Sequence, residues 1–335
     1  MSRRHRLPVT TGLMCLALVV LAMSGCTTPA EKDIDVEQVA LGMRYRDNLE
    51  SGGASVADLA ETDSARQLDP CGMLDEEAVN ALGTPLYFGV GQRLDECVVR
   101  FDRATMSAGI TSVEVSLSVT MGPSGNVSRI GDRAASTLRS TGMCFIALQY
   151  NNRRAFHYMA NAVQGVDPCT ALHTLVTASA PLLDDNPQRA DSTRIPKTRG
   201  ATKDPCAALD AAFPPGQRFY LSSLVPYECD AWLDHHTRDD SNRFGIQVFN
   251  VAESQATYVP SHARKLLLTG VHSIEESGRG DYCIIHAYVG VEEPFPTRSW
   301  DGEPENRVEV LRVTGHGCTK TRELAVAAVK AYQRD

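Results

Sequence analysis

Hydrophobic and polar residues alternate along two stretches of the chain, residues 110–122 (ITSVEVSLSVTMG) and 243–253 (RFGIQVFNVAE). In the first stretch the apolar positions are Val113, Val115, Leu117 and Val119, and the polar positions between them are Glu114, Ser116 and Ser118. Successive side chains of a β-strand point to opposite faces of its sheet. The period of two therefore predicts strands with one buried and one solvated face.

Other segments extend this pattern into an α+β fold. Strands are predicted to begin at Glu96 and Glu228, and hairpin-length connections predict pairs of 144–151 with 154–163 and of 283–290 with 307–314. We expect helices over 128–142 and 259–270. Closing helices are expected from apolar residues at helical spacing: Leu172, Leu175, Val176 and Leu182, then Leu324, Val326, Ala327 and Val329. Such an order predicts antiparallel sheets covered by helices.

The same words recur in the same order in two parts of the chain. DPCGML matches DPCAAL, LDECVVRFD matches PYECDAWLD, GMCFIALQY matches DYCIIHAYV, and DPCTALHTLVTASA matches HGCTKTRELAVAAV. An internal repeat at this spacing predicts two tandem repeated domains. We place them at residues 67–183 and 203–335, joined by a polar linker at 184–202. Residues 291–306 are predicted to form a long loop in the second domain.

The tripeptide Asp-Pro-Cys occurs at residues 69–71, 167–169 and 204–206. Asp can accept a hydrogen bond from an unpaired backbone N–H at the start of a helix, and Pro fits the first helical position. The motif therefore predicts a helix start with a cysteine in its first turn. For Asp69 an alternative cap exists at Asp75, which would leave the motif as a turn before the helix.

The N-terminus has the features of a secretion signal. Arg3, Arg4 and Arg6 precede an apolar run at 13–23, which is shorter than the roughly 20 residues that span a bilayer. The stretch LAMSGC resembles a bacterial lipobox, which predicts cleavage after residue 25 and lipidation of Cys26, with palmitate among its acyl chains. Ordinary signal cleavage is the alternative, and the export route, Sec or twin-arginine, stays open.

Removal of residues 1–25 would change the charge of the chain from −8 to −11, because three arginines leave. Residues 26–66 would then form a flexible tether between the lipid and the first domain. A strongly acidic chain without a basic patch repels nucleic acid. We expect a protein outside the cytoplasm, anchored to the cell membrane by lipid.

The cysteines predict a disulfide framework. Ten are present, of which Cys15 leaves with the signal and Cys26 carries the lipid. No C-x-x-C pair of the kind that binds zinc occurs, and exported proteins are oxidised. Four cysteines per domain allow three pairings, and we predict consecutive pairs: Cys71 with Cys97, Cys144 with Cys169, Cys206 with Cys229, and Cys283 with Cys318.

Together, the lipobox, the Asp-Pro-Cys helix starts and the later Glu-Cys strand starts resemble a family of actinobacterial cell-envelope lipoproteins of unknown function. The resemblance covers residues 69 to about 180 and, less well, 204–335, where Arg100 stands at the position of Trp232. It implies an anchored envelope protein and no catalytic residues. The four-cysteine extracellular sensor domains of some actinobacterial kinases have a similar plan, which implies ligand sensing as an alternative.

Few residues in the sequence indicate a catalytic or metal-binding site. The nucleophile elbow, H-E-x-x-H, P-loop and calcium-loop motifs are missing from the sequence. The densest polar cluster, WLDHHTRDD, contains Asp234, His235, His236, Asp239 and Asp240, but adjacent histidines of a strand point to opposite faces. We interpret it as a solvated turn and expect no metal site.

His157 and His286 are expected to be ordinary sheet residues. Tyr87, Phe88, Tyr220, Tyr227 and Trp232 are expected to be core residues, with a pocket lining as the alternative. We therefore predict a non-enzymatic binding or scaffold protein without a cofactor, whose partner is an unknown small ligand or envelope protein. An envelope hydrolase or transferase without a recognisable motif is the alternative.

Overall fold

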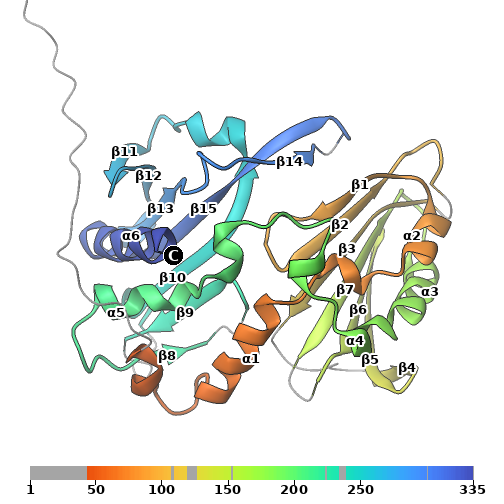
Figure 1. Ribbon diagram of the computed structural model, residues 1–335, viewed down its shortest axis with the longest axis horizontal. Coiled ribbons are helices and arrows are strands. Elements are labelled where there is room, and N and C mark those ends of the chain that lie inside the picture. The colour runs from red at the N-terminus through yellow and green to blue at the C-terminus, as the bar shows by residue number, and fades with distance from the viewer. Residues whose placement is uncertain are drawn as a thin grey trace, which may run out of the picture. The chain divides into compact units, whose positions relative to one another are not determined.

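The computed structural model describes residues 44–334, apart from 107–108, 119–126, 152–153, 223–224, 234–238 and 300 (Figure 1). The predicted signal sequence, Cys26 and the tether up to residue 43 lie outside this range. None of the helices in the described part of the chain has the length and hydrophobicity needed to cross a bilayer. We call residues 67–183 the first half and residues 203–335 the second half.

A seven-stranded antiparallel sheet forms the first half. Its strands are β1 (Pro85–Val90), β2 (Glu96–Phe101), β3 (Ile110–Ser118), β4 (Val127–Ile130), β5 (Arg133–Ser140), β6 (Met143–Gln149) and β7 (Ala155–Ala162). The helical segments up to its end are η1 (Arg44–Asn48), α1 (Val56–Arg66), η2 (Cys71–Met73), α2 (Glu76–Leu82), α3 (Cys169–Ser179) and α4 (Leu182–Asp185). Helix α3 packs on β6 and β7, on one face of the sheet (Figure 1).

An eight-stranded antiparallel sheet forms the second half. Its strands are β8 (Tyr220–Leu221), β9 (Glu228–Trp232), β10 (Arg243–Ala252), β11 (Arg264–Leu268), β12 (Val271–Ser277), β13 (Tyr282–Ala287), β14 (Phe295–Arg298) and β15 (Pro304–His316). The remaining helical segments are η3 (Arg189–Asp191), η4 (Arg199–Thr202), η5 (Pro205–Ala208), α5 (Leu209–Ala212), η6 (Asp240–Asn242), η7 (Glu253–Thr257), η8 (Arg279–Asp281) and α6 (Cys318–Gln333). Helix α6 lies on β13 and β15 (Figure 1).

The predicted α+β class with antiparallel sheets is confirmed. The strand orders are β1-β2-β3-β7-β6-β5-β4 in the first sheet and β8-β9-β10-β15-β13-β12-β11 in the second, with β14 paired to β15 outside this path. When β14 is set aside, the two orders are the same. The predicted strand pairs are also present, as β6 with β7 and β13 with β15.

The four predicted disulfides are present, and each joins a helical segment to a strand. They pair Cys71 with Cys97, Cys144 with Cys169, Cys206 with Cys229, and Cys283 with Cys318, with Cα–Cα distances of 5.0 to 5.2 Å. The cysteines are buried or half-buried members of two hydrophobic cores, which lie between each sheet and the helices on it. The disulfides thus hold the helices to the sheets whose inner faces they cover.

All three Asp-Pro-Cys motifs use their aspartate as expected. The carboxylates of Asp69, Asp167 and Asp204 accept hydrogen bonds of 2.8, 2.9 and 3.0 Å from the backbone N–H of the cysteine two residues on. In the first motif this turn holds only the short η2. Helix α2 begins one turn later, where Asp75 caps it by accepting from the N–H of Ala78. The alternative cap is therefore the one that starts the main helix.

The helices predicted over 128–142 and 259–270 are wrong. The first stretch forms the hairpin of β4 and β5, and the second contains β11, which pairs with β12. Each hairpin turns on a two-residue loop, Gly131-Asp132 and Thr269-Gly270. Gly131, Thr269 and Gly270 have φ of 60°, 49° and 82°, the left-handed region that such loops require. Both dipeptides are typical of hairpin loops and therefore indicate strands, although the apolar spacing around them suggested helices.

Two more segments differ from their predictions. Part of the stretch predicted as a long loop forms β14, which pairs residues 295–298 with 304–307 of β15. Residues 44–66, assigned to a flexible tether, form η1 and α1. Tyr45 and Leu59 from this segment join the core of the second half, while Ala65 joins the core of the first half. Burial of these few side chains explains why the polar segment is folded.

Candidate functional site

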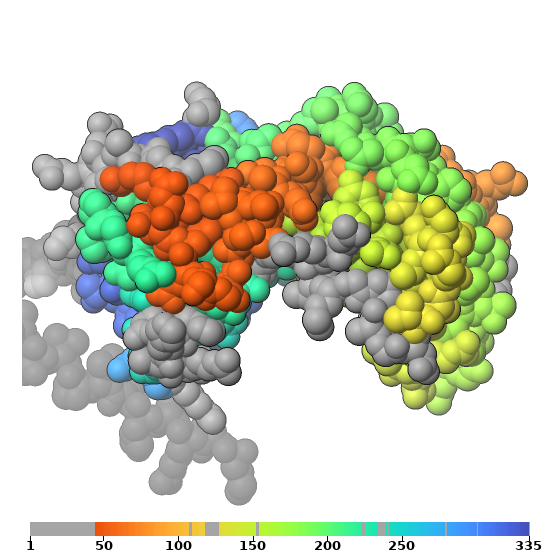
Figure 2. Space-filling view, turned by 90° about the horizontal axis from the view of Figure 1, so that it is seen from below, coloured from red at the N-terminus to blue at the C-terminus, as the bar shows by residue number. Residues whose placement is uncertain are grey.

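Helix α1 contacts both halves of the molecule through buried arginines. Arg154 of the first half donates hydrogen bonds to the carbonyl of Asp58, at 3.2 Å, and to the hydroxyl of Thr62, at 2.7 Å. Arg66, at the end of α1, donates to the carbonyl of Pro226 in the second half, at 2.6 Å. Figure 2 shows residues 44–66, in red and orange, running across the surface of the molecule. Helix α1 therefore links the two halves.

A polar cluster around Asp204, which we call the clasp, holds both ends of the segment 44–66. The Asp204 carboxylate accepts from the hydroxyl of Tyr45 at 2.5 Å and pairs with the guanidinium groups of Arg46 at 2.8 Å and Arg66 at 3.2 Å. Asp63 pairs with both arginines from the more exposed side. Burial, together with the charge of Asp204, raises the pKa of Tyr45 far above its ordinary value. The third Asp-Pro-Cys aspartate thus also binds the segment 44–66, whereas Asp167 of the second motif pairs with the exposed Arg139 of β5.

A groove of about 750 Å³ lies between β1, the segment 193–196 and β14. Residues from both halves line it: Glu76, Asn80, Pro85, Leu86, Tyr87, Phe88, Val90, Thr193, Arg194, Pro196, Pro296, Thr297, Arg298 and Pro304. The guanidinium of Arg194 lies 3.9 Å from the centre of the Phe88 ring, and its charge is paired with Glu76. Four prolines and two aromatic rings give this groove stiff walls, a typical property of ligand sites.

The aromatic residues singled out from the sequence do not form one pocket. Tyr87 and Phe88 line the groove. Tyr220 and Trp232 contact each other edge to face, with ring centres 6.1 Å apart. Tyr227 is a core residue whose hydroxyl lies 3.1 Å from the carbonyl oxygens of two other segments. The sequence did not predict the groove, because its walls come from segments more than a hundred residues apart.

The face of the first sheet opposite its helices carries a row of polar side chains. In the strand register, Glu96 of β2 lies opposite Ser116 of β3, which lies opposite His157 of β7. Burial, followed by the charge and hydrogen bond of Glu96, raises the pKa of Glu114 to about 8. Burial and the charge of Arg93 lower the pKa of His157. The uncharged forms of Glu114 and His157 are thus both favoured by their surroundings.

This row is not arranged as a catalytic triad. Ser116 stands between Glu96 and His157, so the histidine cannot link the hydroxyl to that carboxylate. Within the described residues, neither Ser116 nor His157 makes a side-chain hydrogen bond. The row carries one carboxyl group, that of Glu114, whose protonated form is favoured, but it lacks an activated nucleophile.

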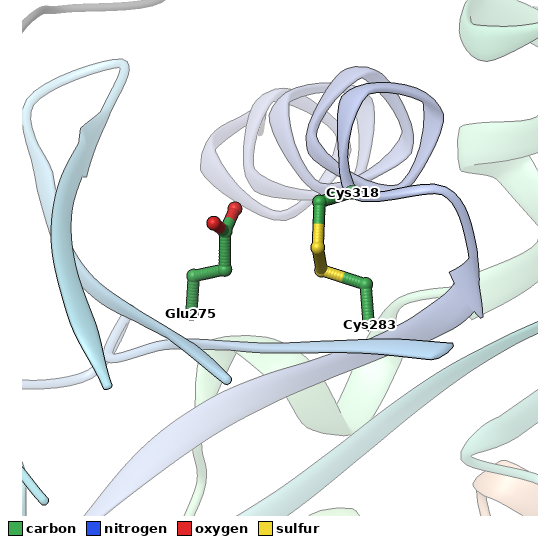
Figure 3. Close-up of side chains that lie close together, drawn as sticks. All are labelled: Glu275, Cys283 and Cys318. Atoms are coloured by element: carbon green, nitrogen blue, oxygen red, sulfur yellow. A yellow bond between two sulfur atoms is a disulfide. The ribbon is translucent and has the colours of Figure 1, made fainter. Parts of the chain in front are cut away.

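Three residues of the second half place metal-type ligand atoms within 4.8 Å of one another: Glu275, Cys283 and Cys318. Figure 3 shows that the two sulfur atoms form the disulfide between β13 and α6, with the carboxylate beside them. A disulfide has no thiolate to offer a metal. The Glu275 carboxylate is moreover paired with the guanidinium of Arg322 on α6. We therefore interpret this cluster as a structural link between sheet and helix.

The remaining polar residues named from the sequence lie in three places. Asp239 is exposed and accepts a hydrogen bond from the backbone N–H of Ser241, and Asp240 begins η6. Asp234, His235 and His236 lie outside the described residues, so the predicted solvated turn stays a prediction. His286 lies on β13, where burial and the charge of Arg312 lower its pKa. Its ring contacts Phe249 edge to face at 6.1 Å.

Comparisons with known proteins add no relatives. No protein-family model matches the chain, and neither a curated protein nor a solved structure matches it significantly. The resemblance to the actinobacterial envelope lipoproteins therefore stays a prediction.

Proposed function

We propose that this protein is a lipid-anchored, extracytoplasmic binding protein of the bacterial cell envelope, and that its ligand occupies the groove between β1 and β14. The observation that carries the proposal is the volume of the groove, about 750 Å³, which lies in the range of sites for small molecules and short peptides. Both halves supply its walls, so a bound ligand would contact the two together. We propose no catalytic role for the groove.

The anchor is inferred from the sequence. LAMSGC places Cys26 at the position that a lipobox modifies, and several acyl chains on one residue give firm attachment to a membrane. Replacement of Cys26 by Ser should release the mature protein from the membrane fraction, and the intact protein should carry a lipid mass on its N-terminal cysteine. An unmodified Cys26 in the membrane-bound protein would contradict the anchor.

We further infer that the two halves are copies of one unit. The strand orders agree, and the disulfides join corresponding elements, η2 to β2 and η5 to β9, then β6 to α3 and β13 to α6. Duplication explains both agreements without a separate cause for each. The groove is lined by non-corresponding elements, because β14 has no counterpart in the first sheet.

The groove is tested by a matched pair of surface substitutions. Leu86 lines the groove and is 37% exposed, and Leu138 lies on β5 and is 67% exposed. We expect the protein isolated from its own envelope to carry a small molecule that native mass spectrometry detects. Leu86→Glu should remove that added mass, and Leu138→Glu should leave it. Retention of the mass in Leu86→Glu would place the ligand elsewhere.

An envelope hydrolase or transferase is the alternative that one observation favours. Glu96 and Glu114 form a half-buried, hydrogen-bonded carboxyl pair, and such pairs can serve as general acid and base. An enzyme using this pair would lose activity on envelope substrates in Glu114→Gln, whereas binding in the groove would persist. Unchanged binding with no measurable turnover in the wild-type protein would favour the binding function.

A further inference from the structure

A second pocket, of about 310 Å³, lies on the face of the second sheet that α6 does not cover. It is lined by β9, β10, β15 and β13, and shares no residue with the groove. Gly245 of β10 lies between Thr314 and Asp230 of the neighbouring strands and adds no side chain of its own to the centre of this face. A Cβ atom there would approach the Thr314 hydroxyl to 2.6 Å.

Charges of opposite sign stand on either side of this pocket. Glu228 of β9 lies opposite Gln247 of β10, which lies opposite Arg312 of β15. The two charged residues are therefore two strand spacings apart, about 10 Å between backbones. Within the described residues, no ion pair or side-chain hydrogen bond joins Glu228 or Arg312 to another residue. Asp230, by contrast, is already paired with Arg243 at 2.9 Å.

The chemistry of the pocket selects one class of ligand. A simple anion bound to Arg312 would face the Glu228 carboxylate, and a simple cation bound to Glu228 would face the Arg312 guanidinium. A molecule with a carboxylate and an ammonium group satisfies both. Gln247, between them, can donate and accept hydrogen bonds. The pocket volume suits a free amino acid or a dipeptide.

We propose that this pocket binds a small zwitterion, an amino acid or dipeptide, with its carboxylate on Arg312 and its ammonium group on Glu228. The site stands apart from the groove, so its test does not depend on the proposed function. Because the corresponding row in the first sheet has His157 at the position of Arg312, the first half lacks the permanent cation that the carboxylate needs.

The test is a calorimetric titration of the mature chain with L-alanine and L-alanyl-L-alanine, compared with acetate and methylammonium. We expect saturable binding of at least one zwitterion and at least tenfold weaker binding of both single ions. Arg312→Gln and Glu228→Gln should each weaken zwitterion binding at least tenfold. Arg218→Gln, an exposed arginine outside the pocket, is the control and should leave the affinity unchanged.

Three outcomes would overturn the proposal. The first is that neither zwitterion shows saturable binding. The second is that acetate binds as tightly as the dipeptide, which would assign a plain anion site. Equal affinities in wild type and Arg312→Gln would also refute it. Circular dichroism of each variant shows whether the fold is retained, and the exposed position of Arg312 makes that the expected result.

Discussion

Replacement of Asp204 by Asn tests the clasp that holds η1 and α1 to the second half. Asn keeps an oxygen that can cap the N–H of Cys206, but it removes the negative charge that faces Arg46 and Arg66. The two guanidinium side chains are only 13% and 6% exposed, so water cannot replace the lost partner. The substitution therefore separates the ionic role of Asp204 from its capping role.

The size of the effect follows from these contacts. Removal of one partner from a buried ion pair costs about 3 to 5 kcal/mol, because the remaining charge stays buried and unpaired. Asp63 still pairs with both arginines, which places the expected loss near the lower end, about 3 kcal/mol. With an m value of about 3 kcal/mol per molar urea, the unfolding midpoint should fall by about 1 M.

The matched control is Asp69→Asn in the first Asp-Pro-Cys motif. Asp69 makes the same bond to its cysteine N–H, at 2.8 Å, but no ion pair within the described residues. Asn and Asp are similar caps, so Asp69→Asn should cost less than about 1 kcal/mol. Both variants are compared by urea unfolding of the oxidised protein at pH 7. Equal losses in the two variants, or no loss in Asp204→Asn, would refute the clasp.

Three further predictions address other parts of the molecule. Joint replacement of Cys71 and Cys97 by Ser should lower the free energy of unfolding in urea by about 3.5 kcal/mol, because the disulfide closes a loop with a sequence separation of 26. Reducing agent, which opens the other disulfides too, should destabilise the wild type more than this. Equal losses would mean that this one disulfide carries the whole effect. Since the pKa of Glu114 is raised from 4.5 to about 8, its contribution to stability is present below pH 4.5 and is lost as the pH rises to about 8, by at most about 1.4 kcal/mol per pH unit. Glu114→Gln should flatten that part of the stability–pH curve, and an unchanged slope would contradict the raised pKa. Gly131→Ala should cost about 1 kcal/mol in thermal unfolding, because Gly131 has a φ of 60° with no neighbour to clash; a neutral result would argue against the β4–β5 hairpin.

Local sequence patterns were sufficient to predict the structure where a single kind of interaction decides it. The alternation in residues 110–118 predicted β3, because a strand between a core and a solvated face has only one register that buries Val113, Val115 and Leu117. The cysteine pairs were also predicted, since each joins a helix start to a strand that follows or precedes it closely. The helices expected at 128–142 and 259–270 failed because two-residue loops outweighed the apolar spacing around them.

The sequence by itself determined the α+β class, through its alternating and helical patterns, and the aspartate-bonded turns at Asp-Pro-Cys. It also indicated which cysteines pair, because each disulfide joins residues at most 35 positions apart. Only the tertiary structure decided the rest. The clasp joins Asp204 to Tyr45 across 159 residues, the groove joins β1 to β14, and the charged pocket places Glu228 and Arg312 on one face. Such sites depend on which strands become neighbours in a sheet, and strand order is set by the burial of whole faces rather than by any local pattern.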